Sequence, residues 1–266
     1  MARTAVSGRL SWLVATVSET REETATARTI VLDVPGWPGH LAGQHVTVKL
    51  TAADGYSAQR SYSIASASEP DRLELTVQRV ADGEVSSYLD EIARPGDQFE
   101  VRGPIGGWFA WRPDDPSPLL LLAGGSGIVP LMSMIRAHDT AKSKAPLQLI
   151  YSVRTPDDVI YADELIKRAR VSPLTVVTLL YTRLTRWRRT PASVTADSQV
   201  SPGPRALPGY AGRLSAEVLA KTAFPPELNP AVYACGPSGF VDAAASLLTG
   251  AGYPPMSIKT ERFGPN

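Results

Sequence analysis

The stretch Gln59-Arg60-Ser61-Tyr62-Ser63-Ile64-Ala65-Ser66 alternates large and small residues around two β-forming residues. This alternation is typical of a β-strand, which would place Arg60 and Tyr62 on one face and Ser61 and Ser63 on the other. A cation, an aromatic ring and a hydroxyl held close together suit a flavin nucleotide. The guanidinium can bind the pyrophosphate, the ring can lie against the flat heterocycle, and the hydroxyl can hydrogen-bond a ring nitrogen. A β-barrel without a ligand also carries such residues, so the interpretation depends on the rest of the chain.

Length and composition indicate a globular protein. The 266 residues suffice for one large domain or two ordinary ones, with 43% hydrophobic and 20% charged residues. The formal net charge of +1 gives no general attraction to nucleic acid or acidic membranes. The amino terminus has no apolar core of signal-peptide length, and the longest apolar run, 119–123, is far below the roughly 20 residues that span a bilayer. We expect a cytoplasmic protein with no membrane insertion and no nucleic-acid partner.

Metal chemistry is not expected from this chain. The single cysteine, Cys235, excludes a disulfide framework and a cysteine-bound zinc or iron–sulfur cluster within the chain. The three histidines, His40, His45 and His138, are scattered and show no metal-ligand spacing.

The first half, residues 1–112, has the pattern of a six-stranded antiparallel β-barrel. Short candidate strands separated by Gly-, Pro- and Asp-rich turns are typical of this architecture. The strands are expected at 10–17, 28–34, 44–50, 60–64, 73–80 and 97–101. One helix is expected at 86–92, opened by Ser86 and Ser87. The N-cap and the free backbone N–H groups of this helix can bind a phosphate. The alternative is an ordinary capped helix that closes one end of the barrel.

After a proline-rich linker at 113–118, residues 119–266 alternate apolar strands with helices. This pattern predicts a parallel sheet covered on both faces. Five strands are expected at 119–123, 147–153, 174–181, 231–235 and 256–260, and helices at 128–138, 161–170, 215–221 and 239–249. Residues 186–212, rich in Pro, Ser, Thr, Ala, Gly and Arg, are expected to form an insertion loop.

Two turns in this second half carry candidate chemistry. Ala123-Gly124-Gly125-Ser126-Gly127-Ile128-Val129-Pro130 leads from a strand into a helix, so its backbone N–H groups and the helix end can bind a pyrophosphate. It departs from the standard dinucleotide fingerprint, and a turn without a ligand is the alternative. Cys235-Gly236-Pro237 follows a strand at the edge where open α/β sheets bind ligands, although a lone cysteine is more often a small buried hydrophobe.

Six motifs in order along the chain resemble the ferredoxin–NADP reductase superfamily. They are Arg60-Ser61-Tyr62-Ser63, Gly83-Glu84-Val85-Ser86, Gly103-Pro104-Ile105-Gly106, Gly124-Gly125-Ser126-Gly127-Ile128-Val129-Pro130, Cys235-Gly236-Pro237 and Glu261-Arg262-Phe263-Gly264. The resemblance covers nearly the whole chain and is greatest to the bacterial branch that supplies reductases to oxygenases and other partners. It implies an FAD-binding barrel followed by a nicotinamide-nucleotide domain, with hydride transfer where they meet.

The resemblance also implies residue roles. Arg60 would bind the FAD pyrophosphate, Tyr62 would lie against the isoalloxazine, and Ser63 would hydrogen-bond near N5. Ser61 would also contact the FAD. The flavin would be bordered by Val77, Gln78, Arg79, Val80 and Phe263, with a second phosphate seat at Val85, Ser86 and Ser87. The nicotinamide nucleotide would be held by Gly125, Ser126, Gly127, Gly236 and Pro237. Cys235 would lie beside the nicotinamide and Glu261 would close the site, so that Ser63, Cys235 and Glu261 form the catalytic set.

The basic residues after the strand at 174–181 favour NADPH over NADH. Related reductases hold the adenosine 2′-phosphate with a Ser/Thr-Arg pair at this position, which Thr182 and Arg183 match. Arg186, Arg188 and Arg189 follow, and Arg154 and Arg213 can contribute forked hydrogen bonds to the phosphate. A solvated basic loop or a docking patch for an acidic partner is the alternative.

The resemblance therefore implies an NADPH oxidoreductase that uses FAD and passes electrons to a separate one-electron acceptor, such as a ferredoxin, an oxygenase or a molybdenum enzyme. The chain lacks the further cysteines of a fused plant-type ferredoxin. We expect it to act as a monomer. An NADH-preferring reductase, a flavin-bearing electron-transfer subunit of a larger complex and a ligand-binding module without redox function are the alternatives.

Overall fold

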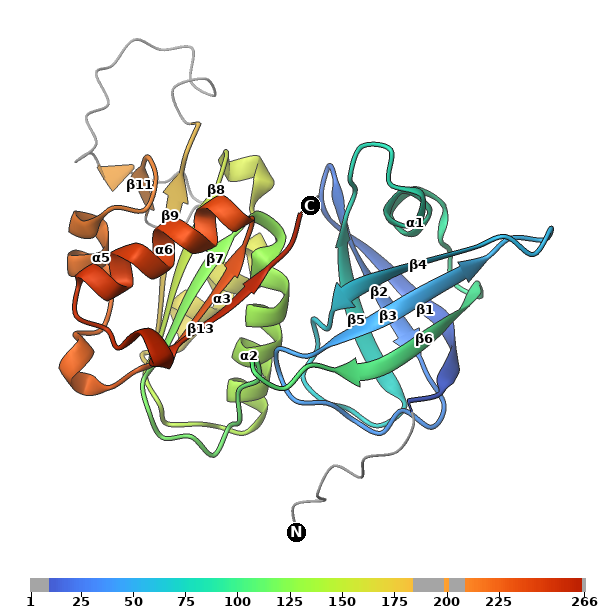
Figure 1. Cartoon of the computed structure of the whole chain (residues 1–266), viewed down its shortest axis with the longest axis horizontal. Helices are drawn as coiled ribbons and strands as arrows, with labels where there is room; N and C mark the ends of the chain where they lie inside the picture. Colours follow the sequence, from blue (N-terminus) through green and yellow to red (C-terminus); the bar gives the residue numbers. More distant parts are fainter. Residues whose placement is uncertain (1–9, 184–198, 201–208, 265–266) are drawn as a thin grey trace.

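The first half folds into the predicted six-stranded antiparallel barrel. The computed structural model describes residues 10–183, 199–200 and 209–264 (Figure 1). The strands lie in the order β4-β3-β6-β1-β2-β5. Their bounds are β1 Trp12–Thr24, β2 Ala27–Asp33, β3 His45–Thr51, β4 Ser57–Ser63, β5 Arg72–Gln78 and β6 Gln98–Ile105. Alternate side chains such as Val46 and Val48 of β3 are fully buried and fill the barrel.

The two edge strands of this sheet, β4 and β5, do not pair with each other in a ladder, and we call this break in the hydrogen bonding of the barrel wall the β4–β5 opening. In the described residues, an isolated bridge between Ile64 and Leu75 joins their corner, where Ala65 N–H also donates to Glu74 O at 2.8 Å. The short helix α1 (Glu84–Ser87) contacts β4, and the π-helical turn that follows it, Tyr88–Ile92, contacts β2 and β5. Helix α1 lies at one end of the barrel (Figure 1).

The second half contains a parallel sheet with one strand more than the five predicted. The order is β10-β11-β9-β8-β7-β12-β13, in which β10 alone pairs antiparallel. The bounds are β7 Leu119–Gly124, β8 Leu147–Val153, β9 Thr175–Tyr181, β10 Gln199–Val200, β11 Gly209–Ala211, β12 Ala231–Gly236 and β13 Ile258–Arg262. The extra strand, β11, lies inside the stretch predicted to be an insertion loop. It forms because Gly209, Tyr210 and Ala211 align with Leu179, Leu180 and Tyr181 of β9.

Helices cover both faces of this sheet, as its apolar strands require. They are α2 Ile128–Thr140, α3 Ala162–Val171, α5 Ala216–Thr222 and α6 Ser238–Gly250. On the face toward the barrel, α2 and α3 pack in one core with Leu121 and Leu149. On the other face, α5 and α6 pack on a second core that contains Leu120 and Leu122. The alternation along β7 thus assigns its leucines to opposite sides.

The barrel and the α/β half share a continuous interior. Ala65, Phe109 and Trp111 belong to the same buried cluster as Leu131 and Ile135 of α2. Trp111 is also attached to the barrel, because its backbone N–H donates to Ala42 O at 3.0 Å. The hydrophobic interior is therefore continuous across the predicted linker. The division of the chain into a barrel domain (1–112), a linker (113–118) and an α/β domain (119–266) stays a prediction.

Polar contacts reinforce this junction, which we call the seam. Side chains of α2 and of the residue before α3 bond to the loop after β4 and to β5. Ser133 Oγ donates to Ser66 O at 2.8 Å, Arg136 Nη1 donates to Glu74 Oε2 at 3.0 Å, and Tyr161 OH donates to Thr76 Oγ1 at 2.5 Å. Arg136 also binds Glu164 Oε2 at 2.6 Å and stacks on the Tyr161 ring at 5.0 Å. Partly buried charges that are paired in this way help to fix the relative position of the two halves.

Candidate functional site

The glycine-rich turn between β7 and α2 brings two backbone segments into close contact. Gly125 has a φ of +53°, in the left-handed region that glycine adopts without strain. Gly127 lies so close to the end of β12 that a Cβ there would be 2.1 Å from the carbonyl oxygen of Cys235. The turn and the N-terminus of α2 are therefore held at the carboxyl ends of two parallel strands, a position that suits a phosphate group.

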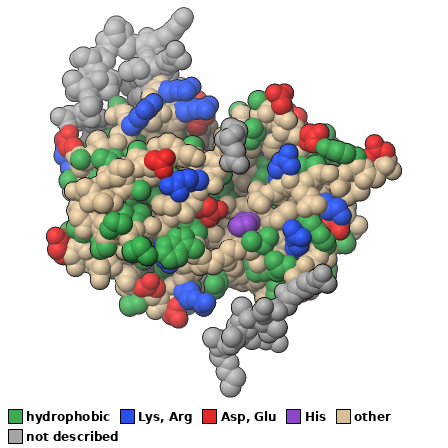
Figure 2. All heavy atoms as spheres, viewed as in Figure 1, with side chains coloured by type: hydrophobic (Ala, Val, Ile, Leu, Met, Phe, Trp, Pro, Cys, Tyr) green, Lys and Arg blue, Asp and Glu red, His purple; other side chains and the backbone are tan. Residues whose placement is uncertain are grey.

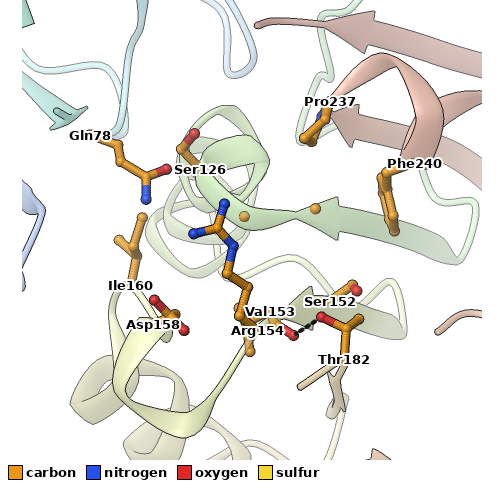
Figure 3. A pocket seen from close by; sticks show the side chains of 12 residues that line it. Gln78, Ser126, Ser152, Val153, Arg154, Asp158, Ile160, Thr182, Pro237 and Phe240 are labelled. Carbon is orange, nitrogen blue, oxygen red and sulfur yellow. Dashed lines mark hydrogen bonds between the residues drawn. The ribbon is translucent and has the colours of Figure 1, made fainter. Parts of the chain in front are cut away.

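A cavity of about 240 Å³ opens in front of this turn (Figure 3). It lies at the carboxyl ends of β7, β8, β9 and β12, and Gln78 at the end of barrel strand β5 completes its wall. The lining residues are Gln78, Gly124, Gly125, Ser126, Ser152, Val153, Arg154, Asp158, Ile160, Thr182, Pro237 and Phe240. A ligand in this cavity would contact both halves of the protein.

The cavity unites five residues that the sequence assigned to the nicotinamide nucleotide, namely Gly125, Ser126, Arg154, Thr182 and Pro237. The side chain of Arg154 projects into it, with its guanidinium between Gln78 and Ser126 (Figure 3). Among the described residues no carboxylate pairs with this guanidinium. Its forked donors are thus available to an anionic ligand.

Thr182 and Arg183 follow β9, and Thr182 lines the cavity. Thr182 Oγ1 donates to Val153 O at 3.2 Å, and Arg183 N–H donates to Arg154 O at 2.9 Å. Arg183 and Arg213, which follow β9 and β11, are exposed. Lys and Arg side chains gather in this upper part of the second half (Figure 2). The predicted phosphate ligand Arg188, with Arg186 and Arg189, lies outside the described residues.

Cys235 and Glu261 are direct neighbours on the paired strands β12 and β13. The Cys235 thiol is fully buried and does not line the cavity. Burial raises its pKa well above the usual value, and the nearby Glu261 carboxylate adds to this, so the thiol is neutral at physiological pH. Burial also raises the pKa of Glu261 to about 7. Phe263 packs against the same core as Cys235 and donates its N–H to Gly236 O at 3.2 Å.

The residues predicted to contact a flavin lie around the opening between β4 and β5. Tyr62 packs against the barrel core, and burial raises its pKa to about 12, an effect that the charge of Arg60 partly opposes. Arg60 is exposed and has no carboxylate partner among the described residues. Ser61 lies opposite Thr47 on the outer face of the sheet, and Ser63 is half-buried at the end of β4. A half-buried aromatic ring beside a guanidinium that has no carboxylate partner among the described residues fits the flavin and the pyrophosphate of an FAD.

Other predicted flavin residues are less available to a ligand. The side chains of Val77 and Val85 are buried in the barrel core. Arg79 is bonded to Glu91 and lies 3.7 Å from Asp90, whereas Val80 beside it is 55% exposed. Only the backbone of the two buried valines can border a flavin.

The prediction that two serines open the helix is wrong. The helix begins at Glu84 after Gly83, which places Ser86 and Ser87 inside it. The Ser86 hydroxyl accepts a hydrogen bond from Val80 N–H and donates one to Gly83 O, both at 3.2 Å. It therefore fixes the preceding turn and is not a free ligand for phosphate.

Five residues of the cavity wall were not predicted: Ser152, Val153, Asp158, Ile160 and Phe240. Asp158 is held by Thr155, whose N–H and hydroxyl donate to its carboxylate at 2.9 and 2.6 Å. The positions of Ser152 and Val153 at the end of a parallel strand are a signal that sequence reasoning could have used. The others reach the cavity through tertiary packing of loops and of the first turn of α6.

Two further observations hold for the described residues. No three or more His, Cys, Asp or Glu side chains gather as metal ligands would. Nor does any helix combine the length and apolar character that a membrane crossing demands.

Comparison with known proteins agrees with this architecture. Residues 15–109 match the family model of an oxidoreductase FAD-binding domain, and residues 121–246 match that of an oxidoreductase NAD-binding domain. The chain is 31% identical over 224 residues to a glycine betaine monooxygenase reductase subunit from Chromohalobacter salexigens, covering 84% of this chain and 55% of that protein. It is 34% identical over 258 residues to the ferredoxin reductase component of a 3-ketosteroid-9-alpha-monooxygenase from Mycolicibacterium smegmatis, covering 93% and 64%.

The chain thus spans between about half and two thirds of the length of these relatives. Among solved structures, a ferredoxin NADP⁺ reductase from Neisseria gonorrhoeae with bound FAD and NADP has a TM-score of 0.74 at 22% identity, covering 94% of this chain and 98% of that one. The likeness of the fold and the two matched domain families lead to one conclusion. The chain belongs to the ferredoxin–NADP reductase superfamily of FAD- and NAD-binding oxidoreductases.

Proposed function

We propose that this protein oxidises NADPH, uses FAD as its cofactor and passes electrons to a separate one-electron acceptor protein. The observation that carries the proposal is the shared cavity, in which Gln78 of the barrel faces the glycine turn and Arg154 of the α/β half. A flavin at the β4–β5 opening and a nicotinamide nucleotide at the glycine turn would then meet at the seam.

In this proposal the chain mainly positions and shields the reactants. Arg60 holds the FAD pyrophosphate, Tyr62 supports the ring and Ser63 donates near N5. The turn Gly125–Gly127 and Arg154 hold the pyrophosphate of the nicotinamide nucleotide. Bound FAD would supply the hydride acceptor and release its electrons one at a time. Cys235, a neutral buried thiol, acts as a packing surface and not as a nucleophile, and Glu261 beside it closes the site.

The direct test is anaerobic addition of NADPH to the purified protein. We expect a yellow protein whose flavin absorbance near 450 nm is lost when NADPH is added. A yellow protein that neither NADPH nor NADH bleaches would instead be an electron-transfer subunit. A colourless protein that takes up no added FAD would end the proposal.

The acceptor is proposed from the printed names of the relatives. A reductase subunit of a glycine betaine monooxygenase and a ferredoxin reductase component of a 3-ketosteroid monooxygenase each serve an oxygenase system. By analogy we propose an oxygenase or a ferredoxin as the acceptor here, with a molybdenum enzyme as another possibility. Turnover of NADPH that depends on added acceptor protein would identify it.

Arg183→Ala should raise the Michaelis constant for NADPH about tenfold or more and leave that for NADH nearly unchanged, because a lost charge-assisted hydrogen bond to the 2′-phosphate is worth about 1.5–3 kcal/mol. Steady-state kinetics with both nucleotides measure the effect. Arg112→Ala, which removes an exposed arginine before β7, is the control for loss of a surface charge. Equal losses with NADPH and NADH would show that Arg183 does not distinguish the two, and faster turnover of NADH by the unaltered protein would establish the NADH-preferring alternative.

A further inference from the structure

Tyr56 extends the row of candidate flavin contacts beyond Arg60 and Tyr62. Ala58 and Tyr62 both pack against the barrel core, so alternation places Arg60 on that same side of β4. Tyr56 lies two residues before Ala58 in the tip of the β3–β4 hairpin. The tip is held by hydrogen bonds from Ala52 N–H to Tyr56 O at 2.8 Å and from Gly55 N–H to Ala52 O at 3.0 Å. The Tyr56 side chain is 58% exposed although its backbone is fixed.

Glu84 connects this tyrosine to α1. Tyr56 OH donates to Glu84 Oε2 at 3.0 Å. This hydrogen bond raises the pKa of the Tyr56 hydroxyl, and the charge of Arg60 acts in the opposite direction, so Arg60 lies within electrostatic reach of the pair. Among the described residues, no Lys, Arg or His forms an ion pair with the exposed Glu84 carboxylate. An aromatic face, an acceptor carboxylate and a guanidinium therefore gather at the hairpin tip.

The spacing along β4 matches the order of the parts of FAD. At about 3.3 Å per strand residue, Arg60 lies about 7 Å from Tyr62 and Tyr56 about 13 Å beyond Arg60. If the flavin ring lies at Tyr62 and the pyrophosphate at Arg60, the chain of FAD continues toward the hairpin tip. The next groups of FAD are a ribose, whose hydroxyls donate to carboxylates, and an adenine, which stacks on aromatic rings.

We propose that Tyr56 and Glu84 bind the adenosine half of FAD, with the Tyr56 ring stacked on adenine and the Glu84 carboxylate accepting hydrogen bonds from the ribose hydroxyls. The inference rests on the proposed function, since it extends the flavin site assigned there. The Tyr56–Glu84 hydrogen bond orients both side chains before the cofactor binds. FMN ends at its phosphate and cannot reach this pair, so the pair would make the site selective for FAD.

The test compares the affinities of FAD and FMN for the flavin-free protein, measured by quenching of flavin fluorescence. Tyr56→Ala should raise the dissociation constant for FAD about tenfold, as loss of one base–aromatic stack does, and leave that for FMN within about twofold. Glu84→Ala should also weaken the binding of FAD and leave the binding of FMN unchanged. Tyr56→Phe, which keeps the ring, should retain most of the affinity. Arg60→Ala should weaken both flavins, because each carries a phosphate at this point.

The outcomes separate this inference from the proposed function. If the unaltered protein binds FAD and Tyr56→Ala and Glu84→Ala leave its affinity unchanged, the adenosine site is wrong while the flavin enzyme stands. Equal weakening of FAD and FMN by Tyr56→Ala would assign Tyr56 a structural role and also overturn the site. A protein that binds neither flavin would refute both.

Discussion

Gly127→Ala is expected to destabilise the protein by about 3 kcal/mol or more, at the upper end of the range for overpacking a buried site. A Cβ at this position would be 2.1 Å from the carbonyl oxygen of Cys235, 2.5 Å from its carbonyl carbon and 2.8 Å from the Gly236 nitrogen. All three are backbone atoms of β12, so no side-chain rotation relieves the clash. The glycine turn and β12 must separate, which would also deform the candidate nucleotide cavity.

Urea denaturation followed by circular dichroism measures this loss of stability. Gly239→Ala is the matched control, since Gly239 lies in α6 and a Cβ there meets nothing within 4 Å. Replacing this helical glycine should leave stability unchanged or raise it by about 0.5–1 kcal/mol. If the two variants unfold at the same urea concentration, the contact between the glycine turn and β12 does not exist in solution.

Glu261→Gln should abolish a pH dependence of stability that the unaltered protein shows. Burial raises the pKa of the Glu261 carboxyl to about 7 from an ordinary value of 4.5. Between these two pH values the folded chain holds a proton that the unfolded chain has released, so stability falls as the pH rises through this window. Above pH 7 the folded chain carries a desolvated carboxylate, at a cost of roughly 1–3 kcal/mol.

The free energy of unfolding of both proteins should therefore be measured from pH 5 to pH 8. We expect the difference between them to change by roughly 1–3 kcal/mol over this range, with the glutamine variant gaining relative stability at high pH. Glu69→Gln, which neutralises an exposed carboxyl, is the control for loss of a surface charge. A stability difference between Glu261→Gln and the unaltered protein that stays constant with pH would show that the carboxyl is solvated in the folded state.

Much of the fold follows from patterns that single segments contain. The barrel strands alternate, and β7 begins with four consecutive leucines that must be buried on both faces. Strand β11 lacks such a signal, because Gly209, Tyr210 and Ala211 become a strand only by pairing with β9. A three-residue strand defined by its neighbour is not visible in its own sequence, which explains why five parallel strands were predicted and six formed.

In the candidate site, too, some residues could be identified from the local sequence and others only from tertiary packing. The glycine turn was identified from the backbone N–H groups that it presents, Thr182 from its match to the Ser/Thr-Arg pair of related reductases, and Arg154 as a further cation for the phosphate. Phe240 and Ile160 reach the cavity only through the packing of α6 and of the loop before α3. The error at Ser86 has a local cause. Helix initiation at Glu84 moved the serine from the expected cap position to the third helical residue.

The seam has a consequence for domain shuffling. Arg136 and Tyr161 bond to Glu74 and Thr76, and the backbone N–H of Tyr161 donates to Glu23 Oε2 at 3.2 Å. A chimera that joined this barrel to the nucleotide-binding half of another reductase would leave the partly buried carboxylates of Glu23 and Glu74 with only their partners inside the barrel, Thr29 and Arg21. The two halves should therefore exchange with the least loss of stability when the incoming half carries donors equivalent to Arg136 and Tyr161.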